Sequence, residues 1–321
     1  MKKTFLFSLV LLACIVGCEQ SQPTVDLSTN GTANCYIVSA PGTYSIPAVK
    51  GNSNESVGNV KSVEVLWESC GSDDVLVKDL IQAVEFKTQK ICFKTANVFK
   101  RGNALIAAKD NKGNILWSWH IWMTEQPQEQ VYYNDAGVMM DRDLGAILNS
   151  SGDMCDGMLY QWGRKDPFAK YSLKSTIDFD WEMYDAEIGT VEYATAHPTT
   201  EIGVAISEYE VANNGSWCYH KNRKLWDEDK TIYDPCPVGW RVPDRDIWKN
   251  AMGLGIPHVE FHEKGYLFAQ NLGEYNVIYP QSHYWTTALH FFECFDRIAG
   301  GDHTCEDYGS YKAYVRCQKI E

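Results

Sequence analysis

Residues 233–243 read YDPCPVGWRVP, and this stretch decides how the second half of the chain is interpreted. Pro235 and Pro237 restrict the backbone on both sides of Cys236 and remove two main-chain donors. The cysteine is therefore expected in a rigid, non-helical turn. The turn leads into the one helix that the pattern predicts, from about residue 245 to 252, with Asp244 as its N-cap.

The rest of the second half has few regular patterns. It is rich in aromatic residues and glycine, and residues 171–230 lack clear periodicity, so we expect a long loop or insertion there. The segment 126–130, QPQEQ, is polar and contains a proline, and it is the natural boundary between the two halves.

The turn is also one of several short segments that occur in a recognisable order. Together they resemble the FISUMP, or major paralogous, domain of anaerobic gut bacteria. The segments are MDRDLGA at 140–146, GMLYQWGRKDPF at 157–168, YDPCPVGWRVP at 233–243, YWTT at 284–287 and YVRC at 314–317. That family has a C-type-lectin-like fold, so the resemblance implies such a domain over residues 131–321.

The resemblance also implies disulfides. A bond between Cys236 and Cys317 would tie the first helix to the last strand, as the lectin-like fold does. In the final strand Cys317 alternates with polar residues and falls on the apolar face. Cys294 and Cys305 lie where the fold often carries a second bridge; the alternative is a free buried cysteine at either position.

The first half, residues 34–125, has the pattern of a β-sandwich. Short β-rich runs are separated by Gly, Asn and Asp, and the clearest hairpin has its turn at 110–113. The runs are 35–38, 60–67, 83–87, 91–94, 104–108 and 115–123. In the last of these, apolar side chains occupy both faces, so we expect that strand to be covered on both sides. The segments 34–38 and 116–122 resemble, more loosely, an immunoglobulin-like or fimbrillin-like sandwich module that often precedes the FISUMP domain. The expected fold class is therefore mainly β, with an α+β C-terminal part.

The N-terminus has the pattern of an export signal. Lys2 and Lys3 precede a short apolar run over 4–16 that is too short to span a bilayer. Residues 15–18, IVGC, resemble the bacterial lipobox, which implies cleavage after residue 17 and a lipid on Cys18. Residues 11–14, ending in Cys14, fit the same pattern but leave a very short apolar run; an ordinary cleaved signal is the other alternative. Residues 18–33 are then expected to be a polar tether.

Charge and cysteine content limit the classes of partner. The net charge is −13, and removing residues 1–17 with their two lysines makes it about −15. Such a surface argues against nucleic acid as a partner and against electrostatic binding to anionic lipid.

Nine cysteines remain beyond Cys18 without any CxxC, which favours disulfides in an oxidising compartment over a zinc ribbon. They are Cys35, Cys70, Cys92, Cys155, Cys218, Cys236, Cys294, Cys305 and Cys317. Because nine is odd, at least one is free or paired outside the chain.

The candidate ligand site lies between residues 281 and 308, because lectin-like folds commonly meet ligands in the long loop and the strand beside it. Its candidate residues are Tyr284, Trp285, Glu293, Asp296, Asp302 and Asp307. The aromatic pair is suited to stacking on sugar faces, although an aromatic in such a strand more often packs in the core. The carboxylates suit calcium, but the calcium-lectin motifs are absent, and a solvated acidic loop is the favoured interpretation.

Catalytic and metal motifs are not recognisable in the sequence. His258 and His262 have helical spacing in a region where Gly and Pro argue against a helix, and on a strand they would be about 13 Å apart. His120 and His197 have no visible partner, and Asp141 and Asp143 are expected on exposed turns. Formylglycine-generating enzymes have a related fold, but none of their motifs occurs. No metal, no cofactor and no enzyme activity is expected.

These features predict a lipid-anchored, adhesin-like or fimbria-associated protein at the outer-membrane surface of a Gram-negative bacterium. Its C-terminal domain would bind a glycan or a protein, and its only membrane contact would be the lipid. The alternative is a structural or accessory fimbrial subunit, in which the sandwich contributes or accepts a strand in a polymer.

Overall fold

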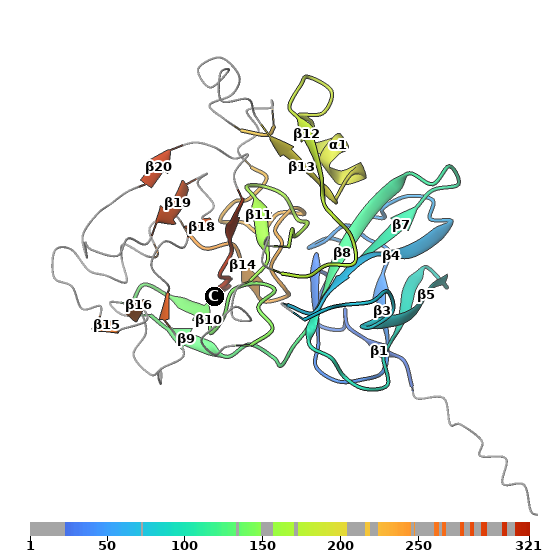
Figure 1. The fold of residues 1–321 in the computed structure, drawn as a ribbon, viewed down its shortest axis with the longest axis horizontal. Coiled ribbons are helices and arrows are strands. Elements are labelled where there is room, and N and C mark those ends of the chain that lie inside the picture. The colour runs from blue at the N-terminus through green and yellow to red at the C-terminus, as the bar shows by residue number, and fades with distance from the viewer. Residues whose placement is uncertain are drawn as a thin grey trace, which may run out of the picture.

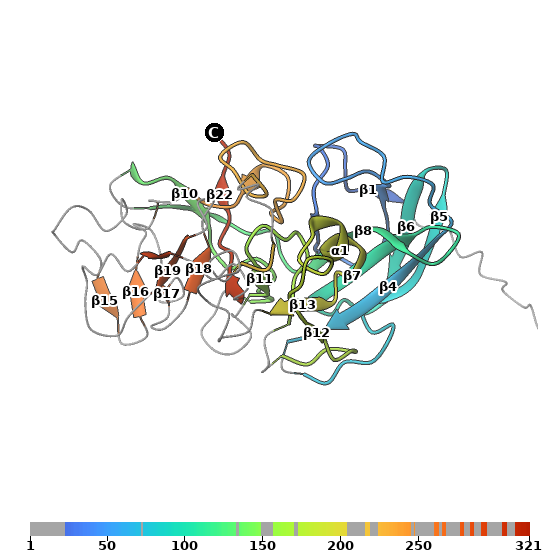
Figure 2. The same ribbon diagram turned by 90° about the horizontal axis from the view of Figure 1, so that it is seen from above.

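The computed structural model describes most of the chain outside its first 22 residues. The described ranges are 23–71, 73–132, 135–148, 157–169, 173–203, 216–218, 224–244, 247 and 312–321, together with the backbone of the short strands between 260 and 306. The chain is mainly β with several sheets, as expected, and it has one short helix within the described ranges. Figures 1 and 2 show the arrangement.

The first half forms two four-stranded sheets. One has the order β1 (Val25–Asp26), β3 (Thr43–Pro47), β6 (Lys90–Thr95) and β5 (Ile81–Lys87). The other has the order β2 (Cys35–Val38), β8 (Ile115–Met123), β7 (Gly102–Lys109) and β4 (Ser62–Ser69). The strand expected over 35–38 has the predicted bounds, and the other predicted strands match to within a few residues.

One apolar core joins these two sheets. Ile46, Ile91 and Phe93 from the first sheet pack with Trp117 and Trp119 from the second, and each of these side chains is almost fully buried. Burying an aliphatic or aromatic side chain contributes about 1.5–3 kcal/mol, so this core stabilises the pairing of the sheets.

The β7–β8 hairpin is formed by the turn that the sequence indicates. The Asp110 carboxylate accepts hydrogen bonds from the main-chain N–H groups of Lys112 and Asn114, at 2.8 and 2.9 Å. Gly113 has φ +87°, a conformation that glycine adopts at little cost. The turn thereby fixes the register in which β7 and β8 pair.

Strand β8 is covered on both sides, as its sequence predicts. Trp117, Trp119 and Ile121 belong to the core between the two sheets, whereas Trp122 belongs to a second core. That second core contains Trp67 and Leu105 from the first half and the apolar residues of the second half, among them Met140, Met158, Tyr160, Cys236, Val315 and Cys317. The two halves of the chain therefore share a core.

The described residues of the second half form four further sheets. The first is β14 (Trp240–Arg241), β22 (Gln318–Lys319), β10 (Val138–Met140) and β9 (Glu129–Val131). The second is β11 (Leu159–Gln161), β21 (Lys312–Tyr314), β18 (His283–Trp285), β19 (His290–Glu293) and β20 (Thr304–Glu306). The others are the pair β12 (Asp180–Met183) and β13 (Thr200–Gly203), and the sheet β15 (Glu260–His262), β16 (Gly265–Leu267) and β17 (Val277–Ile278).

Three sequence expectations need correction. The segment 171–230 is not simply a loop, because it contains β12, the helix α1 (Val191–Ala196) and β13. Thr190 caps α1 by accepting a hydrogen bond from the Tyr193 N–H, a signal the sequence carries but periodicity does not reveal in so short a helix. The folded body also begins inside the expected tether, at β1, and the segment 126–130 runs into β9.

The expected helix over 245–252 lies outside the described residues, apart from Ile247. The carboxylate of Asp244, the residue predicted to cap that helix, forms an ion pair with the Arg241 guanidinium at 2.6 Å. Among the residues that the structure describes, no helix is long and apolar enough to cross a membrane.

Candidate functional site

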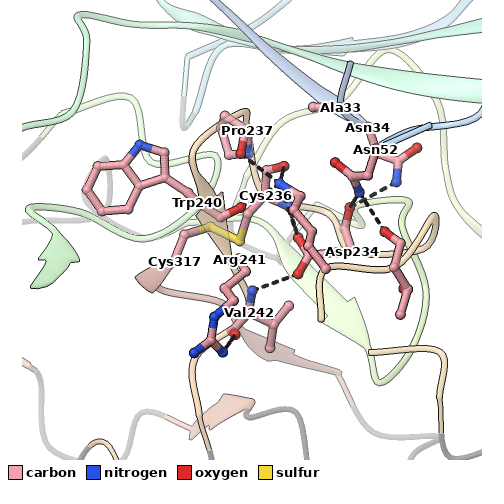
Figure 3. A network of polar contacts seen from close by, with 12 residues as sticks. Ala33, Asn34, Asn52, Asp234, Cys236, Pro237, Trp240, Arg241, Val242 and Cys317 are labelled. Atoms are coloured by element: carbon pink, nitrogen blue, oxygen red, sulfur yellow. Dashed lines mark hydrogen bonds and ion pairs between the residues drawn. A yellow bond between two sulfur atoms is a disulfide. The ribbon is translucent and has the colours of Figure 1, made fainter. Parts of the chain in front are cut away.

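The disulfide expected between Cys236 and Cys317 is present, with 6.0 Å between the two Cα atoms (Figure 3). Both cysteines are fully buried. Cys236 lies in the turn before β14 and Cys317 directly before β22, and these two short strands pair with each other. Strand β22 also pairs with β10, so the bond links the turn, the last strand and the first strand after the boundary.

Asp234 holds the turn in shape from the inside. Its carboxylate, which is fully buried, accepts hydrogen bonds from the N–H groups of Cys236 and Val242, both at 2.8 Å. The Lys230 ammonium lies 3.7 Å from this carboxylate and donates to the carbonyls of Cys236 and Pro237, each at 2.7 Å. Burial raises the pKa of Asp234 and lowers that of Lys230, and the attraction between the two charges opposes both shifts. These contacts make Asp234 and Lys230 part of the framework.

Two asparagines of the first half bind the main chain just before the disulfide (Figure 3). The Asn34 side-chain amide donates to the carbonyls of Ile232 and Asp234 at 2.7 and 2.9 Å, and its Oδ1 atom accepts from the Trp117 indole. Asn52 donates to the Thr231 carbonyl at 2.6 Å. The turn at residues 233–243, which we call the closing turn, is thus fixed to the first half as well as to the last strand.

A second buried polar group lies where β8 meets the second half. The Lys165 ammonium contacts the Asp166 carboxylate at 2.6 Å and the Ser118 hydroxyl at 2.5 Å, and Ser118 donates to Asp166 at 2.6 Å. The ammonium also lies 4.6 Å from the centre of the Trp117 ring. Burial lowers the pKa of Lys165, and Asp166 opposes that shift.

His120 on β8 faces the same interface. Its Nε2 lies 2.8 Å from the Asn103 amide oxygen, and its Nδ1 lies 3.4 Å from the Tyr160 hydroxyl. Full burial lowers the pKa of His120 to about 3. The sequence showed no partner for this residue; the structure makes it a neutral, hydrogen-bonded core histidine.

We expect His120 to make the fold sensitive to acid. The unfolded chain binds a proton here near pH 6.5, whereas the folded chain binds it only near pH 3, so stability falls as the pH drops through this window. The slope from this one group is about 1.4 kcal/mol per pH unit, or about 2 kcal/mol between pH 6.5 and 5. Urea unfolding at pH 7.5, 6 and 5 should show a smaller acid loss for His120→Gln than for the parent chain. The exposed His197→Gln serves as the control, and equal slopes in all three proteins would contradict the assignment.

Asp141, Arg142 and Asp143 do not lie on exposed turns, which corrects the sequence expectation. All three are buried, and Arg142 forms a two-point ion pair with Asp141, with both N–O distances 2.9 Å. Asp143 binds the Arg316 guanidinium at 2.7 Å, beside the disulfide cysteine Cys317. The charged residues of this segment hold the fold together, so they are not free to act as an acid–base pair.

Gln161 and Arg164 fix the β12–α1–β13 unit to the core. The Gln161 side chain donates to the Ile202 carbonyl at 2.8 Å and accepts from the Ile202 N–H at 3.2 Å, as a neighbouring strand would. The buried Arg164 guanidinium donates to the carbonyls of Thr200, Ala194 and His197 at 2.6, 3.2 and 3.0 Å. Burial lowers the pKa of Arg164 to about 10, so it remains charged at neutral pH.

The predicted ligand residues fall only partly within the described strands. Tyr284 and Trp285 lie on β18, where they pair with Phe292 and Phe291 of β19, and Glu293 ends β19 opposite His283. The structure therefore brings three of the six predicted residues to two neighbouring strands. Asp296, Asp302 and Asp307 lie outside the described residues, as do Cys18, Cys155, Cys294 and His258. Cys305 lies on β20 and His262 on β15, and the predicted pairing of Cys294 with Cys305 remains untested.

Other chemical groups within the described residues serve the fold. Cys35, Cys70 and Cys92 are not in disulfides. Burial raises the pKa of Cys70 to about 11 and that of Cys35 further, so neither supplies a thiolate at neutral pH. No cluster of metal-ligating side chains occurs among the described residues.

An open pocket of about 600 Å³ lies beside the closing turn, between it and the first half. Thr32, Asn52 and Lys230 line it, and all three donate to main-chain carbonyls. These polar groups serve the fold, and we assign no ligand to the pocket.

One exposed feature was missed at the level of sequence. Trp181 and Met183 on β12 have 54% and 42% of their surface exposed, which is unusual for large apolar side chains on a strand. The alternation of acidic and apolar residues in DWEM, at 180–183, is the signal that could have found this strand.

Comparison of the chain with protein-family models, curated proteins and solved structures finds no match. The class that the structure itself defines is a mainly β protein in which two halves share a core and a disulfide closes the second half.

Proposed function

We propose that this chain is a lipid-anchored cell-surface recognition protein, adhesin-like or fimbria-associated, whose C-terminal half binds a glycan or a protein. In this proposal the first half is an immunoglobulin-like or fimbrillin-like sandwich, and the second is a C-type-lectin-like domain of the FISUMP type. The protein is held at the outer membrane through a lipid on Cys18.

The position of the disulfide is the observation that carries this proposal. Cys236 and Cys317 enclose a sequence separation of 81 residues, and strands β15 to β20 lie between them with Tyr284, Trp285 and Glu293. Both ends of the candidate binding segment are therefore tied to one buried base. A segment fixed in this way tolerates variation in its loops without loss of the core, as recognition proteins require.

The same bond supports an exported location. Disulfides form and persist in oxidising compartments and are rare in the cytosol. A buried disulfide between the turn before β14 and the start of β22 agrees with the export signal and lipobox resemblance of residues 1–18. The Ser-, Thr- and Gln-rich residues 19–24 ahead of β1 supply a short tether to the membrane.

Lipid anchoring is tested by replacing single cysteines. We expect Cys18→Ala to move the protein from the membrane fraction to the soluble fraction of a Gram-negative host, because the acyl chains that hold it would no longer be attached. Labelling with radioactive palmitate should be lost in parallel. Cys14→Ala is the matched control and should leave both readouts unchanged. Loss of labelling in Cys14→Ala alone would place the lipid on Cys14. Labelling that is retained in both variants would exclude a lipobox at either cysteine.

Recognition is tested with the chain from residue 19, because the shared core argues against cutting it at the boundary. The soluble protein is applied to a glycan array and used to capture surface proteins of neighbouring cells. We expect binding that Trp285→Ala weakens and that the exposed first-half variant Val98→Ala leaves unchanged. Silence in both assays would refute the recognition function, and binding insensitive to Trp285→Ala would place the ligand elsewhere.

A further inference from the structure

Strand β12 forms an open edge on the second half. All four of its residues, Asp180–Met183, are exposed, and in the described part of the chain it pairs only with β13. The pairing with β13 is parallel, with Trp181 beside Glu201 and Met183 beside Gly203. The outer side of β12 therefore presents main-chain N–H and C=O groups to solvent, as a sheet edge that accepts another strand does. We call Asp180–Met183 the β12 edge.

The β12 edge is held in a fixed position. Its partner β13 is bonded on its inner side by the Gln161 side chain and the Arg164 guanidinium. Helix α1 connects the two strands (Figure 1), and its carboxyl-terminal carbonyls are bound by the same guanidinium. Because the edge is already ordered, it loses little conformational entropy when a partner binds.

Trp181 is held in place on this edge although it is exposed. A Cβ atom on Gly203 would lie 2.4 Å from the indole Cζ2 atom, so the ring lies directly on the glycine of the neighbouring strand. By the two-residue period of a strand, Met183 shares the face of Trp181, while Asp180 and Glu182 share the other face. The β12 edge is thus apolar on one face and acidic on the other.

The segment that carries the edge is acidic. Residues 175–203 contain seven carboxylates and neither Lys nor Arg. The carboxylates are Asp178, Asp180, Glu182, Asp185, Glu187, Glu192 and Glu201. Glu201 is neutralised by Lys312 at 2.5 Å; the other six form no ion pair within the described residues. This charge attracts a cationic partner and repels anionic lipid, nucleic acid and a second copy of this acidic chain.

We propose that the β12 edge binds an extended basic polypeptide segment as an added strand. The segment alternates basic and apolar side chains: the basic ones meet Asp180 and Glu182, and the apolar ones meet Trp181 and Met183. This inference rests on the proposed recognition function and adds a second contact surface, on β12, for a partner of this class, beside the one proposed on β18 and β19.

The test measures binding of a labelled peptide, acetyl-KVKVKVKVK-amide, to the chain from residue 19 by fluorescence anisotropy. We expect binding that weakens with added salt. The peptide EVEVEVEVE should not bind, because its charge is repelled. A version of the lysine peptide with proline at the two central valines should bind more weakly, because it lacks main-chain donors for the ladder.

Two kinds of variant separate the apolar face from the acidic face. Trp181→Ala and Met183→Ser should each weaken binding about fivefold, and Asp180→Asn/Glu182→Gln should weaken it about fivefold and reduce its salt dependence. Val98→Ala, which removes an exposed apolar side chain of the first half, and Asp74→Asn, which removes an exposed charge there, are the matched controls and should change neither. The β12 side chains are exposed, so circular dichroism should show that all variants fold.

The inference would be overturned by equal affinity of the parent and both Trp181→Ala and Met183→Ser, by equal affinity for the proline peptide, or by self-association in ultracentrifugation that Trp181→Ala abolishes. A neutral glycan that binds through Trp181 without salt dependence would also overturn it. Failure here is distinct from failure of the proposed function, because the array and capture assays report recognition through any surface.

Discussion

Removing the Cys236–Cys317 disulfide is expected to lower the free energy of unfolding by about 4 kcal/mol. The bond closes a long loop, with a sequence separation of 81 residues, and its loss gives the unfolded chain many more conformations. The loss should be visible as a lower urea midpoint of Cys236→Ala/Cys317→Ala relative to the parent. Dithiothreitol should lower the midpoint of the parent towards that of the variant.

Cys92→Ala is the matched control for this measurement, because Cys92 is not in a disulfide and is only half-buried. It should change the midpoint little, and the reductant should act on it as on the parent. A double variant as stable as the parent would show that β22 is held by its pairing with β10 and β14 alone. The lectin-like assignment would then lose its main support.

Asp166→Asn is expected to destabilise the fold by about 3–5 kcal/mol, because it leaves the Lys165 ammonium buried without its counter-charge. The asparagine keeps the size of the side chain, so little of the effect comes from a cavity. Lys165→Met/Asp166→Asn should recover much of the loss, since no buried charge remains. The measurement is urea unfolding of the two variants and the parent at pH 7.

The pH dependence of Asp166→Asn gives an independent check. In the folded variant the pKa of Lys165 is depressed by burial with no carboxylate opposing it, so the unfolded chain binds more protons between the two pKa values. Its stability should therefore rise as the pH increases from 7 to 9, more than that of the double variant. Equal stability of the single and the double variant would show that an unpaired Lys165 ammonium does not destabilise the interface.

The first half was predictable because its signals are local. On β8, Trp117 and Trp119 lie on one face and Trp122 lies on the other, and the Asp110 turn fixes the hairpin. The period-two pattern therefore indicated both the strand and its burial on two sides. The pattern could not indicate what covers the second face. That face is covered by the second half of the chain, through contacts that span long sequence separations, such as Trp122 with the Ala146 carbonyl.

The charged segments of the second half were harder to interpret. A sequence motif such as GRKDP shows polar residues, and polar residues are usually exposed. Here Arg164, Lys165 and Asp166 are buried, and each has a partner from another segment: Thr200 for Arg164, and Ser118 for Lys165 and Asp166. Only the tertiary contacts show that these residues build the framework.

The candidate site could be predicted in part. The resemblance implies a strand at Tyr284 and Trp285, and the structure has a strand there, with β19 and β21 as its neighbours. Trp181 was missed because burial, not sequence pattern, distinguishes a core tryptophan from an exposed one. The sequence does not show that Trp181 lies against Gly203 with acidic neighbours on the same strand, because this arrangement depends on the pairing of β12 with β13.

The parallel pairing of β2 with β8 has a mechanical consequence. In the proposed tethered protein, a pulling force from the N-terminus would pass β1 and reach β2 at its amino end, while the second half is reached from the carboxyl end of β8. In a parallel pair these forces act in opposite directions along the strands, so the ladder from Cys35 with His120 to Val38 with Met123 is loaded in shear. Its hydrogen bonds would then resist the load together instead of opening one after another, as the proposed anchor at one end and the proposed bound partner at the other would require.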